Sequence, residues 1–368
     1  MKILYVTTVG ITMGFFKGFI KGLLDEGHTV DIATNEQDFP VADCYREWGC
    51  RVFPISTSRS PLSMGNVKAV GQIKRLVMTE KYDLVHCHTP IAAFCTRLAC
   101  RKARKKLGTK VFYTAHGFHF YKGAPKKNWL IFYTAEKLVA RYTDVLITMN
   151  GEDYALAQKK LRAKKVAYVP GVGIDLSKFG KAEINVAEKR ASLGVPEGAT
   201  LLLSVGELNE NKNHSTVIRT LKDFENVHYV IAGKGHLEAE LLALAAAEGV
   251  CDRLHLLGYR TDVAELYAAA DAFVFPSYRE GLSVSLMEAM ATGLPVVCSA
   301  IRGNVDLIDE QGGALFDPHS VDACREAIAT VLAADRAAAG AYNKEKVTEF
   351  STDTVFAAMR LLYGTKAR

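Results

Sequence analysis

The sequence lacks several features that would assign it to a common class of protein. No stretch approaches the ~18–20 uninterrupted apolar residues of a membrane-spanning helix, and we expect no secretory signal, because no apolar segment with a cleavage site follows the first residues. No C-x-x-C pair occurs among the eight cysteines. We therefore expect the cysteines to be mostly small buried side chains in a reducing compartment, without a zinc site.

Motifs that bind phosphate or metal ions are also missing. The chain contains no G-x-x-x-x-G-K-[ST] motif, the loop after the first predicted strand does not read G-x-G-x-x-G, and no D-x-D motif occurs. The sequence therefore argues against a P-loop, a dinucleotide site of the usual type and a metal ion held by paired aspartates.

Positive charge is present, and it is concentrated in the first half of the chain. Residues 1–170 carry 27 Lys and Arg against 13 Asp and Glu, whereas residues 171–368 carry 19 against 27. A basic half indicates an anionic partner, such as nucleic acid or the negatively charged leaflet of a membrane. Because no recognised nucleic-acid-binding motif occurs, we expect no nucleic-acid partner.

Short apolar runs alternate with helical patterns along the 368 residues, which predicts an α/β fold with two parallel sheets. Glycine and proline interrupt this alternation between Pro170 and Gly198. We therefore predict a first domain over residues 1–170, a linker over 171–198 and a second domain over 199–353.

The segment Phe275–Pro295 is the most informative, because a strand, a short loop and a helix follow one another. Glu280 lies in the loop and Glu288 about two turns into the helix. The amides of Gly281–Ser285 open this helix, and unpaired amides at a helix start bind anions such as a diphosphate. The two carboxylates could accept hydrogen bonds from sugar hydroxyls, or they could be ordinary helix-start and solvated acids.

Polar residues also follow two other predicted strands. Lys212 comes after the strand Thr200–Val205, where it could reach a phosphate or lie on the surface. His116 and His119 follow the strand Lys110–Thr114 among aromatic residues, and each could contact a ligand or be structural. Ligands of such sheets bind at the carboxyl ends of the strands, so these loops are candidates for a binding site.

The first loop and the basic clusters each allow two interpretations. Gly14 lies where backbone could approach a phosphate, although the surrounding motif is incomplete. Basic residues near Phe15, Phe16, Tyr121 and Trp129 fit either a solvated helix face or contact with an anionic membrane. The basic residues concerned are Lys17, Lys21, Arg97, Arg101, Lys102, Arg104, Lys105, Lys106, Lys122, Lys126 and Lys127.

Taken together, these segments resemble the GT-B-fold retaining glycosyltransferases of family 4, in the bacterial branch that builds capsular and exopolysaccharide repeat units. The two glutamates of FPSYREGLSVSLMEAMATGLPVV carry the resemblance, and GELNENKNH, TAHGFHF, YVPGVGIDLSKF and LGYRTDVAELYAAADAFVFPS match in order and spacing. The resemblance covers essentially the whole chain. It implies two Rossmann-like domains facing a central cleft, with a last helix, 354–368, that returns to the first domain.

The resemblance also implies residue roles. Glu280 would bind hydroxyls of the donor sugar, Lys212 would neutralise its diphosphate, and His116 would lie beside the sugar and the acceptor. Glu288 would hold the ribose and Arg260 would lie by the base. The remaining residues expected to bind sugar and phosphate are Gly14, Gly281, Leu282 and Ser283.

The expected activity is transfer of a hexose or N-acetylhexosamine from a UDP-sugar to a polyprenyl-diphosphate-linked saccharide, with retention of configuration. No cofactor and no metal ion are expected, because Lys212 and helix amides would stabilise the leaving diphosphate. The protein is expected to be cytoplasmic and peripherally associated with the inner face of the cell membrane.

One departure from the family pattern is Glu207, where many relatives place an arginine that contacts the diphosphate. Arg302 is a candidate to supply the second positive charge. The departure leaves an inactive scaffold of polysaccharide assembly as an alternative. A nucleotide-sugar epimerase of the same fold and a nucleic-acid-binding protein are the other two.

Overall fold

The computed structural model describes residues 1–180 and 184–364. The chain divides into two compact units. Unit 1 comprises Met1–Val172 together with the chain from Phe356 onward, and unit 2 comprises Gly173–Val355. Within these residues no helix is long and apolar enough to cross a membrane.

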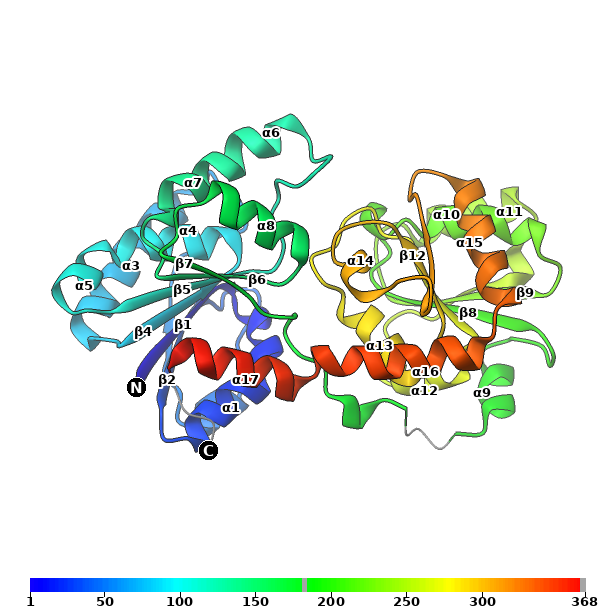
Figure 1. Cartoon of the computed structure of the whole chain (residues 1–368), viewed down its shortest axis with the longest axis horizontal. Helices are drawn as coiled ribbons and strands as arrows, with labels where there is room; N and C mark the ends of the chain where they lie inside the picture. The colour runs from blue at the N-terminus through cyan, green and yellow to red at the C-terminus, as the bar shows by residue number, and fades with distance from the viewer. Residues whose placement is uncertain (181–183, 365–368) are drawn as a thin grey trace. The chain divides into compact units, whose positions relative to one another are not determined.

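Unit 1 is built on a seven-stranded parallel sheet in the described part of the chain, with strand order β3-β2-β1-β4-β5-β6-β7 (Figure 1). The interior strand β1, with the sequence KILYVTTV, is buried over six consecutive residues, as expected for a parallel strand covered on both faces. The strands are β1 (Lys2–Val9), β2 (Thr29–Asn35), β3 (Val52–Pro54), β4 (Leu84–His88), β5 (Lys110–Ala115), β6 (Val145–Thr148) and β7 (Lys165–Tyr168).

Helices connect these strands and cover both faces of the sheet (Figure 1). They are η1 (Gly10–Phe16), α1 (Lys17–Asp25), α2 (Cys44–Glu47), α3 (Met64–Glu80), α4 (Pro90–Ala99), α5 (Arg101–Lys106), α6 (Lys126–Asn128), the π-helical turn η2 (Trp129–Tyr133), α7 (Thr134–Ala140) and α8 (Gly151–Lys160).

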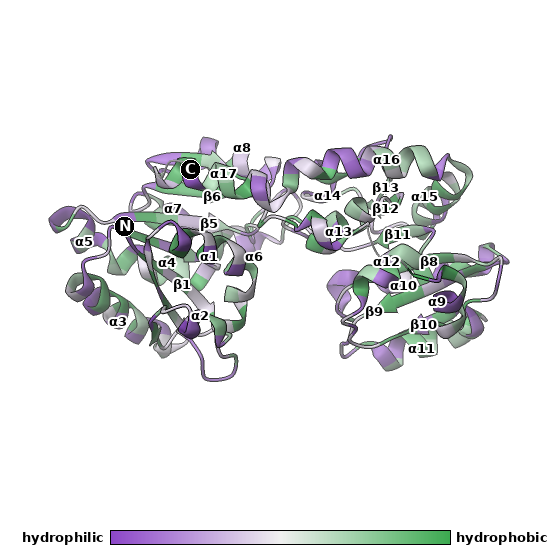
Figure 2. Ribbon diagram, turned by 90° about the horizontal axis from the view of Figure 1, so that it is seen from below, coloured by the Kyte–Doolittle hydropathy of each residue, from purple (hydrophilic) through white to green (hydrophobic). Residues whose placement is uncertain are grey.

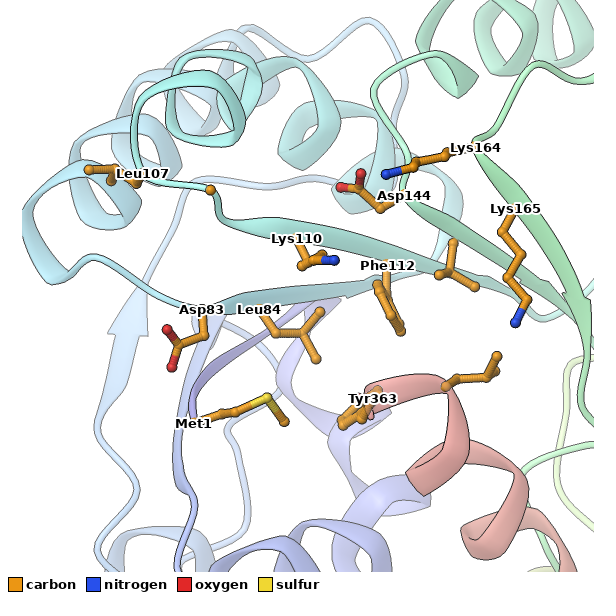
Figure 3. Close-up of a pocket in the computed structure, with 13 residues that line it drawn as sticks. Met1, Asp83, Leu84, Leu107, Lys110, Phe112, Asp144, Lys164, Lys165 and Tyr363 are labelled. Atoms are coloured by element: carbon orange, nitrogen blue, oxygen red, sulfur yellow. The ribbon is translucent and has the colours of Figure 1, made fainter. Parts of the chain in front are cut away.

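The last helix, α17 (Thr352–Tyr363), packs against unit 1. The hydroxyl of Tyr363 lies 2.7 Å from that of Tyr5 and 2.5 Å from Nδ1 of His86. Its ring lies beside Phe112 of β5, at the edge of a pocket of about 710 Å³ (Figure 3). The predicted return of helix 354–368 to the first domain can be followed through residue 364, and residues 365–368 lie outside the described part.

Unit 2 contains a six-stranded parallel sheet in its described residues, with order β10-β9-β8-β11-β12-β13. Strands β8 and β9 are strongly hydrophobic, whereas α5 of unit 1, with the sequence RKARKK, is hydrophilic (Figure 2). The strands are β8 (Thr200–Val205), β9 (Val227–Ala232), β10 (Leu254–Leu256), β11 (Ala272–Phe275), β12 (Val296–Ser299) and β13 (Gly313–Phe316).

The helices of unit 2 alternate with these strands. They are η3 (Leu176–Lys178), α9 (Val186–Ser192), η4 (Glu210–Lys212), α10 (His214–Thr220), η5 (Leu221–Asp223), α11 (Glu238–Ala247), η6 (Cys251–Arg253), α12 (Val263–Ala269), α13 (Val284–Thr292), α14 (Asn304–Leu307), α15 (Val321–Ala333), α16 (Arg336–Lys346) and η7 (Val347–Phe350).

The prediction of two doubly wound parallel-sheet domains is confirmed. The segment predicted as a linker, 171–198, differs from a linker in the structure. Its residues Ile174, Leu193 and Val195 are buried in the core of unit 2, and α9 forms within it. Glycine and proline there mark turns of a packed segment rather than a flexible connection. Residues 181–183 of that segment lie outside the described part.

One of the basic residues interpreted as a solvated face or a membrane contact is buried instead, and so is one of the aromatic residues near the basic clusters. Arg97 is fully buried on α4 and makes a bidentate ion pair with Glu136 of α7, at 2.7 and 2.9 Å. Phe16 is 7% exposed and packs on the ring of His88. An amphipathic helix pattern does not reveal which long side chain finds a buried partner, so the surface interpretation of Arg97 was wrong.

Candidate active site

Three loops of unit 2 meet because they follow neighbouring strands. Strands β8, β11 and β12 are adjacent and parallel, so the loops that carry Lys212, Glu280 and Arg302 emerge at the same edge of the sheet. The strand order changes direction between β8 and β11, the type of position where sheets of this class bind ligands. Residues distant in sequence are therefore brought together by topology.

An ion pair links the first two loops. Nζ of Lys212 lies 2.8 Å from Oε1 of Glu280 and 4.6 Å from the ring centre of Phe275. Both side chains are mostly buried, with 19% and 15% of their surfaces exposed. The pair is held by backbone contacts, because the amide of Tyr278 donates to the carbonyl of Asn211 at 2.8 Å. A charged pair in this setting is fixed in position before any ligand arrives.

Arg302 joins this pair from the third loop. It is 6% exposed, and its Nε donates to the backbone carbonyl of Glu280 at 3.0 Å. The next residue, Gly303, has φ of +80°, and a Cβ there would lie 2.2 Å from the carbonyl oxygen of Gly281. A glycine is therefore required for the third loop to approach the second.

The start of α13 follows the glutamate loop directly. Ser283 is the N-cap residue, and its hydroxyl accepts a hydrogen bond from the amide of Leu286 at 3.3 Å. Gly281 and Leu282 lie just before it and are partly exposed. The predicted loop-to-helix arrangement is therefore present, with Glu280 four residues before the first helical residue.

Glu288 lies within α13 and has a different environment. Its carboxylate accepts a hydrogen bond from the hydroxyl of Tyr267 at 3.0 Å. Burial raises the pKa of Glu288, while that hydrogen bond and the charge of Lys178 act in the opposite direction. The two glutamates therefore differ chemically: Glu280 is paired with a cation, and Glu288 is held by a neutral phenol.

Arg260 lies in the loop between β10 and α12. Its guanidinium makes two hydrogen bonds to Asp262, at 2.7 and 2.5 Å, and these bonds lower the pKa of that carboxyl. The neighbouring Tyr259 is 73% exposed. Arg260 is therefore fixed in orientation at the rim of the sheet edge.

One loop of this edge was missed by the sequence analysis. Strand β9 is followed by Gly233, Lys234 and Gly235, next to the loop that carries Lys212. A Cβ at Gly233 would lie 1.7 Å from the carbonyl oxygen of Gly206, and one at Gly235 would lie 2.1 Å from that of Leu208. The signal was a G-x-G directly after a strong strand, and it places Lys234 at the same edge.

Histidines occupy the corresponding edge of unit 1. His86 lies within β4, His88 ends that strand, and His116 follows the adjacent strand β5. Nδ1 of His88 lies 3.2 Å from Nε2 of His116, and the buried Nε2 of His88 has no hydrogen-bond partner among the residues described. This favours the tautomer in which Nδ1 of His88 donates to His116, because a neutral ring carries one donor and one acceptor.

Burial keeps these histidines neutral. It lowers the pKa of His86 to about 3 and that of His116 to about 4, and the pKa of His88 lies well below its usual value. His116 remains partly exposed, so its ring can contact a ligand. His119, the other sequence candidate, instead stacks on Phe132 with ring centres 4.6 Å apart.

Gly10 and Gly14, which follow the first strand, differ in the space around them. Gly14 is exposed in η1, and a Cβ there would meet no atom within 4 Å. A Cβ at Gly10 would lie 2.3 Å from the carbonyl oxygen of Phe39. The fold itself therefore requires glycine at position 10, whereas position 14 leaves open space that a ligand could use.

Comparison with known proteins shows the family to which this chain belongs. Residues 2–150 match the glycosyl transferase 4-like family, and residues 185–346 match the glycosyl transferases group 1. A protein named as the glycosyltransferase EpsD, from Bacillus subtilis (strain 168), is 37% identical over 324 residues, which cover 86% of this chain and 83% of EpsD. The chain belongs to the group 1 glycosyltransferases.

A second similar enzyme and a solved structure are consistent with this family and its fold. A UDP-Gal:alpha-D-GlcNAc-diphosphoundecaprenol alpha-1,3-galactosyltransferase from Escherichia coli is 31% identical over 304 residues, covering 79% of this chain and 77% of that enzyme. Among solved structures, Anabaena HepE in complex with UDP has a TM-score of 0.83 at 20% identity, covering 99% of this chain and 100% of HepE. At that identity the structural likeness supports the GT-B fold alone.

The structure of this glycosyltransferase brings several of the predicted site residues together. Glu280, Lys212 and the start of α13 share one edge of unit 2, and Arg302 lies there as well. Glu207 is exposed and accepts a hydrogen bond from the side-chain amide of Asn209 at 2.8 Å. No group of three or more His, Cys, Asp or Glu placed to hold a metal ion occurs in the ranges that the structure describes.

Proposed function

We propose that this glycosyltransferase moves a hexose or N-acetylhexosamine from a UDP-sugar to a polyprenyl-diphosphate-linked saccharide, in the assembly of a capsular or exopolysaccharide. Two names among similar proteins support this substrate class: the Escherichia coli relative acts on a diphosphoundecaprenol-linked sugar, and HepE forms complexes with UDP and with UDP-glucose. Residues of this chain must then bind a diphosphate and sugar hydroxyls.

The observation that carries the proposal is the Lys212–Glu280 pair beside the start of α13. In the proposed complex the ammonium of Lys212 contacts the diphosphate, and Glu280 is freed to accept hydrogen bonds from hydroxyls of the donor sugar. The amides of Gly281, Leu282 and Ser283 bind sugar and phosphate. Glu288 binds the ribose, Arg260 lies by the base, and the backbone at Gly14 approaches the phosphates.

We propose a retaining reaction without a metal ion. The bond between the anomeric carbon and the diphosphate oxygen breaks, and a bond to the acceptor hydroxyl forms on the same face. The leaving phosphate oxygen takes the proton of that hydroxyl. Lys212, with Arg302 nearby, and the helix amides supply the positive potential that a metal ion would otherwise provide. His116 contacts the sugar and the acceptor as a neutral ring.

The proposed location is the cytoplasm, at the inner face of the cell membrane. The basic helix α5 and the exposed side chains of Lys122, Lys126 and Lys127 would be attracted to anionic lipids and to a diphosphate acceptor. Co-sedimentation with anionic vesicles at low salt tests this part. Equal recovery with neutral and anionic vesicles would contradict it.

The function is tested by UDP release from a panel of UDP-sugars in EDTA, with and without diphosphoundecaprenol-linked saccharides. Acceptor-dependent release from one donor is the expected result, and the anomeric configuration of the product by NMR tests retention. Lys222→Ala is the matched control for Lys212→Ala, because Lys222 forms an exposed ion pair with Glu248 away from the site. UDP release without acceptor, together with sugar epimerisation, would overturn the transferase proposal.

A further inference from the structure

An apolar groove runs along the surface of unit 1 between α3, α4 and α7, three helices that lie side by side (Figure 1). Its volume is about 560 Å³, within the ~300–1,000 Å³ range of small-molecule sites. Several of its side chains are large, apolar and well exposed: Leu62 (93%), Met64 (77%), Val67 (65%) and Ile131 (54%). Such a cluster is unusual for a surface that faces only water.

The polar side chains that line the groove already have partners. The amide group of Asn66 bonds to Ser58 and Ser60, the hydroxyl of Ser63 caps α3, and Glu136 is paired with the buried Arg97. An extended peptide strand would therefore find few hydrogen-bond partners in this lining, whereas a hydrocarbon chain needs none. Hydrocarbon is the chemistry that this lining accepts.

One end of the groove meets a more polar pocket of about 350 Å³. The two share Pro61, Pro90, Ile91 and Phe132 as lining residues. The second pocket lies at the carboxyl ends of β1 and β4, where Thr8, Thr89 and Arg59 line it. Arg59 is exposed, its guanidinium lies over the ring of Phe39, and no carboxylate is within ion-pair distance of it in the described residues. The combined site is apolar along its length and cationic at one end.

We infer that this groove binds the isoprenoid chain of the acceptor, with the acceptor's diphosphate at Arg59. The inference rests on the proposed lipid-linked acceptor and adds the place where its lipid lies. The charge arrangement supports it, because a polyprenyl diphosphate is apolar along its chain and anionic at one end. The groove then selects acceptors by their lipid, independently of the donor site in unit 2.

The test uses the full chain and two probes with the same anionic group. Geranylgeranyl diphosphate carries four isoprene units and dimethylallyl diphosphate carries one, so their difference reports the hydrocarbon alone. Equilibrium binding is expected to favour the long probe by about tenfold or more. Val67→Ser and Ile131→Ser should each remove most of that preference, and Arg59→Ala should weaken the binding of both probes.

Leu130→Ser is the matched control for Ile131→Ser. Leu130 is the neighbouring residue, is 74% exposed and does not line the groove. The control is expected to retain the preference for the long probe. Equal affinity for the two probes, or equal loss in Leu130→Ser and Ile131→Ser, would overturn the inference. The second result would indicate a general apolar surface that docks on a membrane.

The outcome is separable from that of the proposed function, because neither probe is a sugar donor or a sugar acceptor. Long-probe binding that depends on Val67 and Ile131 supports the groove even if no UDP is released from any donor. Conversely, acceptor-dependent UDP release with no chain-length preference would support the transferase and overturn the groove.

Discussion

The two units place different chemistry at equivalent edges of similar sheets. In unit 2, Lys212, Glu280 and Arg302 gather at the edge beyond β8, β11 and β12, so charge is present and already paired. In unit 1, His88 and His116 occupy the edge beyond β4 and β5, and burial keeps them neutral. The same topology therefore supports an ion pair beyond β8 and β11 of unit 2 and a cluster of neutral histidines beyond β4 and β5 of unit 1.

This difference corresponds to what each edge would have to bind. A leaving diphosphate gains negative charge during transfer, so fixed cations beside it stabilise the transition state. An acceptor hydroxyl is neutral until it loses its proton, and a permanently charged neighbour is not required there. The comparison can be sharpened by removing charge from one edge and protonating the other.

The largest effect is expected from removing the cation of unit 2. Lys212→Ala should lower kcat/KM by about 10²–10³-fold, because a preorganised charge beside the leaving group is lost. Glu280→Gln should lower it as well, and both are measured as acceptor-dependent UDP release. The thermal unfolding of each variant should stay close to that of Lys222→Ala. A Lys212→Ala enzyme with unchanged kcat/KM would show that this edge does not hold the leaving diphosphate.

The second-largest effect is expected from replacing Gly233 of unit 2, compared with Gly14 of unit 1. Gly233→Ala places a Cβ against the carbonyl oxygen of Gly206, so unit 2 should lose about 2–3 kcal/mol of unfolding free energy. Gly14→Ala meets no atom and should change stability by less than about 0.5 kcal/mol. Urea unfolding measures both. If Gly14→Ala also leaves UDP-sugar turnover unchanged, the proposed approach of its backbone to phosphate is wrong.

Acid should weaken unit 1 more than unit 2. Burial lowers the pKa of His86, His88 and His116 in unit 1. In unit 2 it lowers the pKa of His214 to about 4, and it also lowers the pKa of His228 and His255. The unfolded chain then binds more protons than the folded chain below about pH 6.5, so stability falls as pH decreases.

Each histidine with a strongly lowered pKa should cost about 1 kcal/mol between pH 6.5 and 5.5. The expected loss is therefore about 3 kcal/mol around β4 and β5, from His86, His88 and His116, and about 1 kcal/mol in unit 2 from His214, to which His228 and His255 add a smaller loss. Amide hydrogen exchange, corrected for intrinsic rates at each pH, measures the two regions in one sample. Equal losses in the two sheets would contradict the assignment of neutral histidines to unit 1.

Much of the fold could be predicted because buried parallel strands are short apolar runs between turn residues. The strand Thr200–Val205 was predicted with the bounds that the structure shows, and the strand predicted at Lys110–Thr114 extends one residue further, to Ala115. Strand β13 was missed, because GALF is short, follows a glycine and is a strand only through pairing with β12.

The candidate site was predictable residue by residue but not pair by pair. Strand ends marked Lys212, Glu280 and His116 as candidates, since each follows an apolar run. The sequence did not show that Lys212 contacts Glu280, because that contact depends on β8 and β11 being neighbours. The burial of Arg97 was missed for the same reason: its partner lies 39 residues away on another helix.

The smallest effect concerns the helix that returns to unit 1. Tyr363→Phe removes one hydroxyl and leaves the hydroxyl of Tyr5 and Nδ1 of His86 without that partner. Unsatisfied buried groups make this change cost about 1–1.5 kcal/mol of unfolding free energy, whereas Leu361→Ala at an 80% exposed position of the same helix should cost less than about 0.5 kcal/mol. Urea unfolding of the two variants compares these two losses of unfolding free energy.

The same variant also tests what keeps His86 neutral. In Tyr363→Phe, His86 lacks one of its hydrogen bonds but stays buried, so the unfolding free energy should fall while its dependence on pH stays the same. A variant that loses the acid sensitivity of β4 and β5 would instead show that α17, rather than the sheet, keeps His86 from protonating.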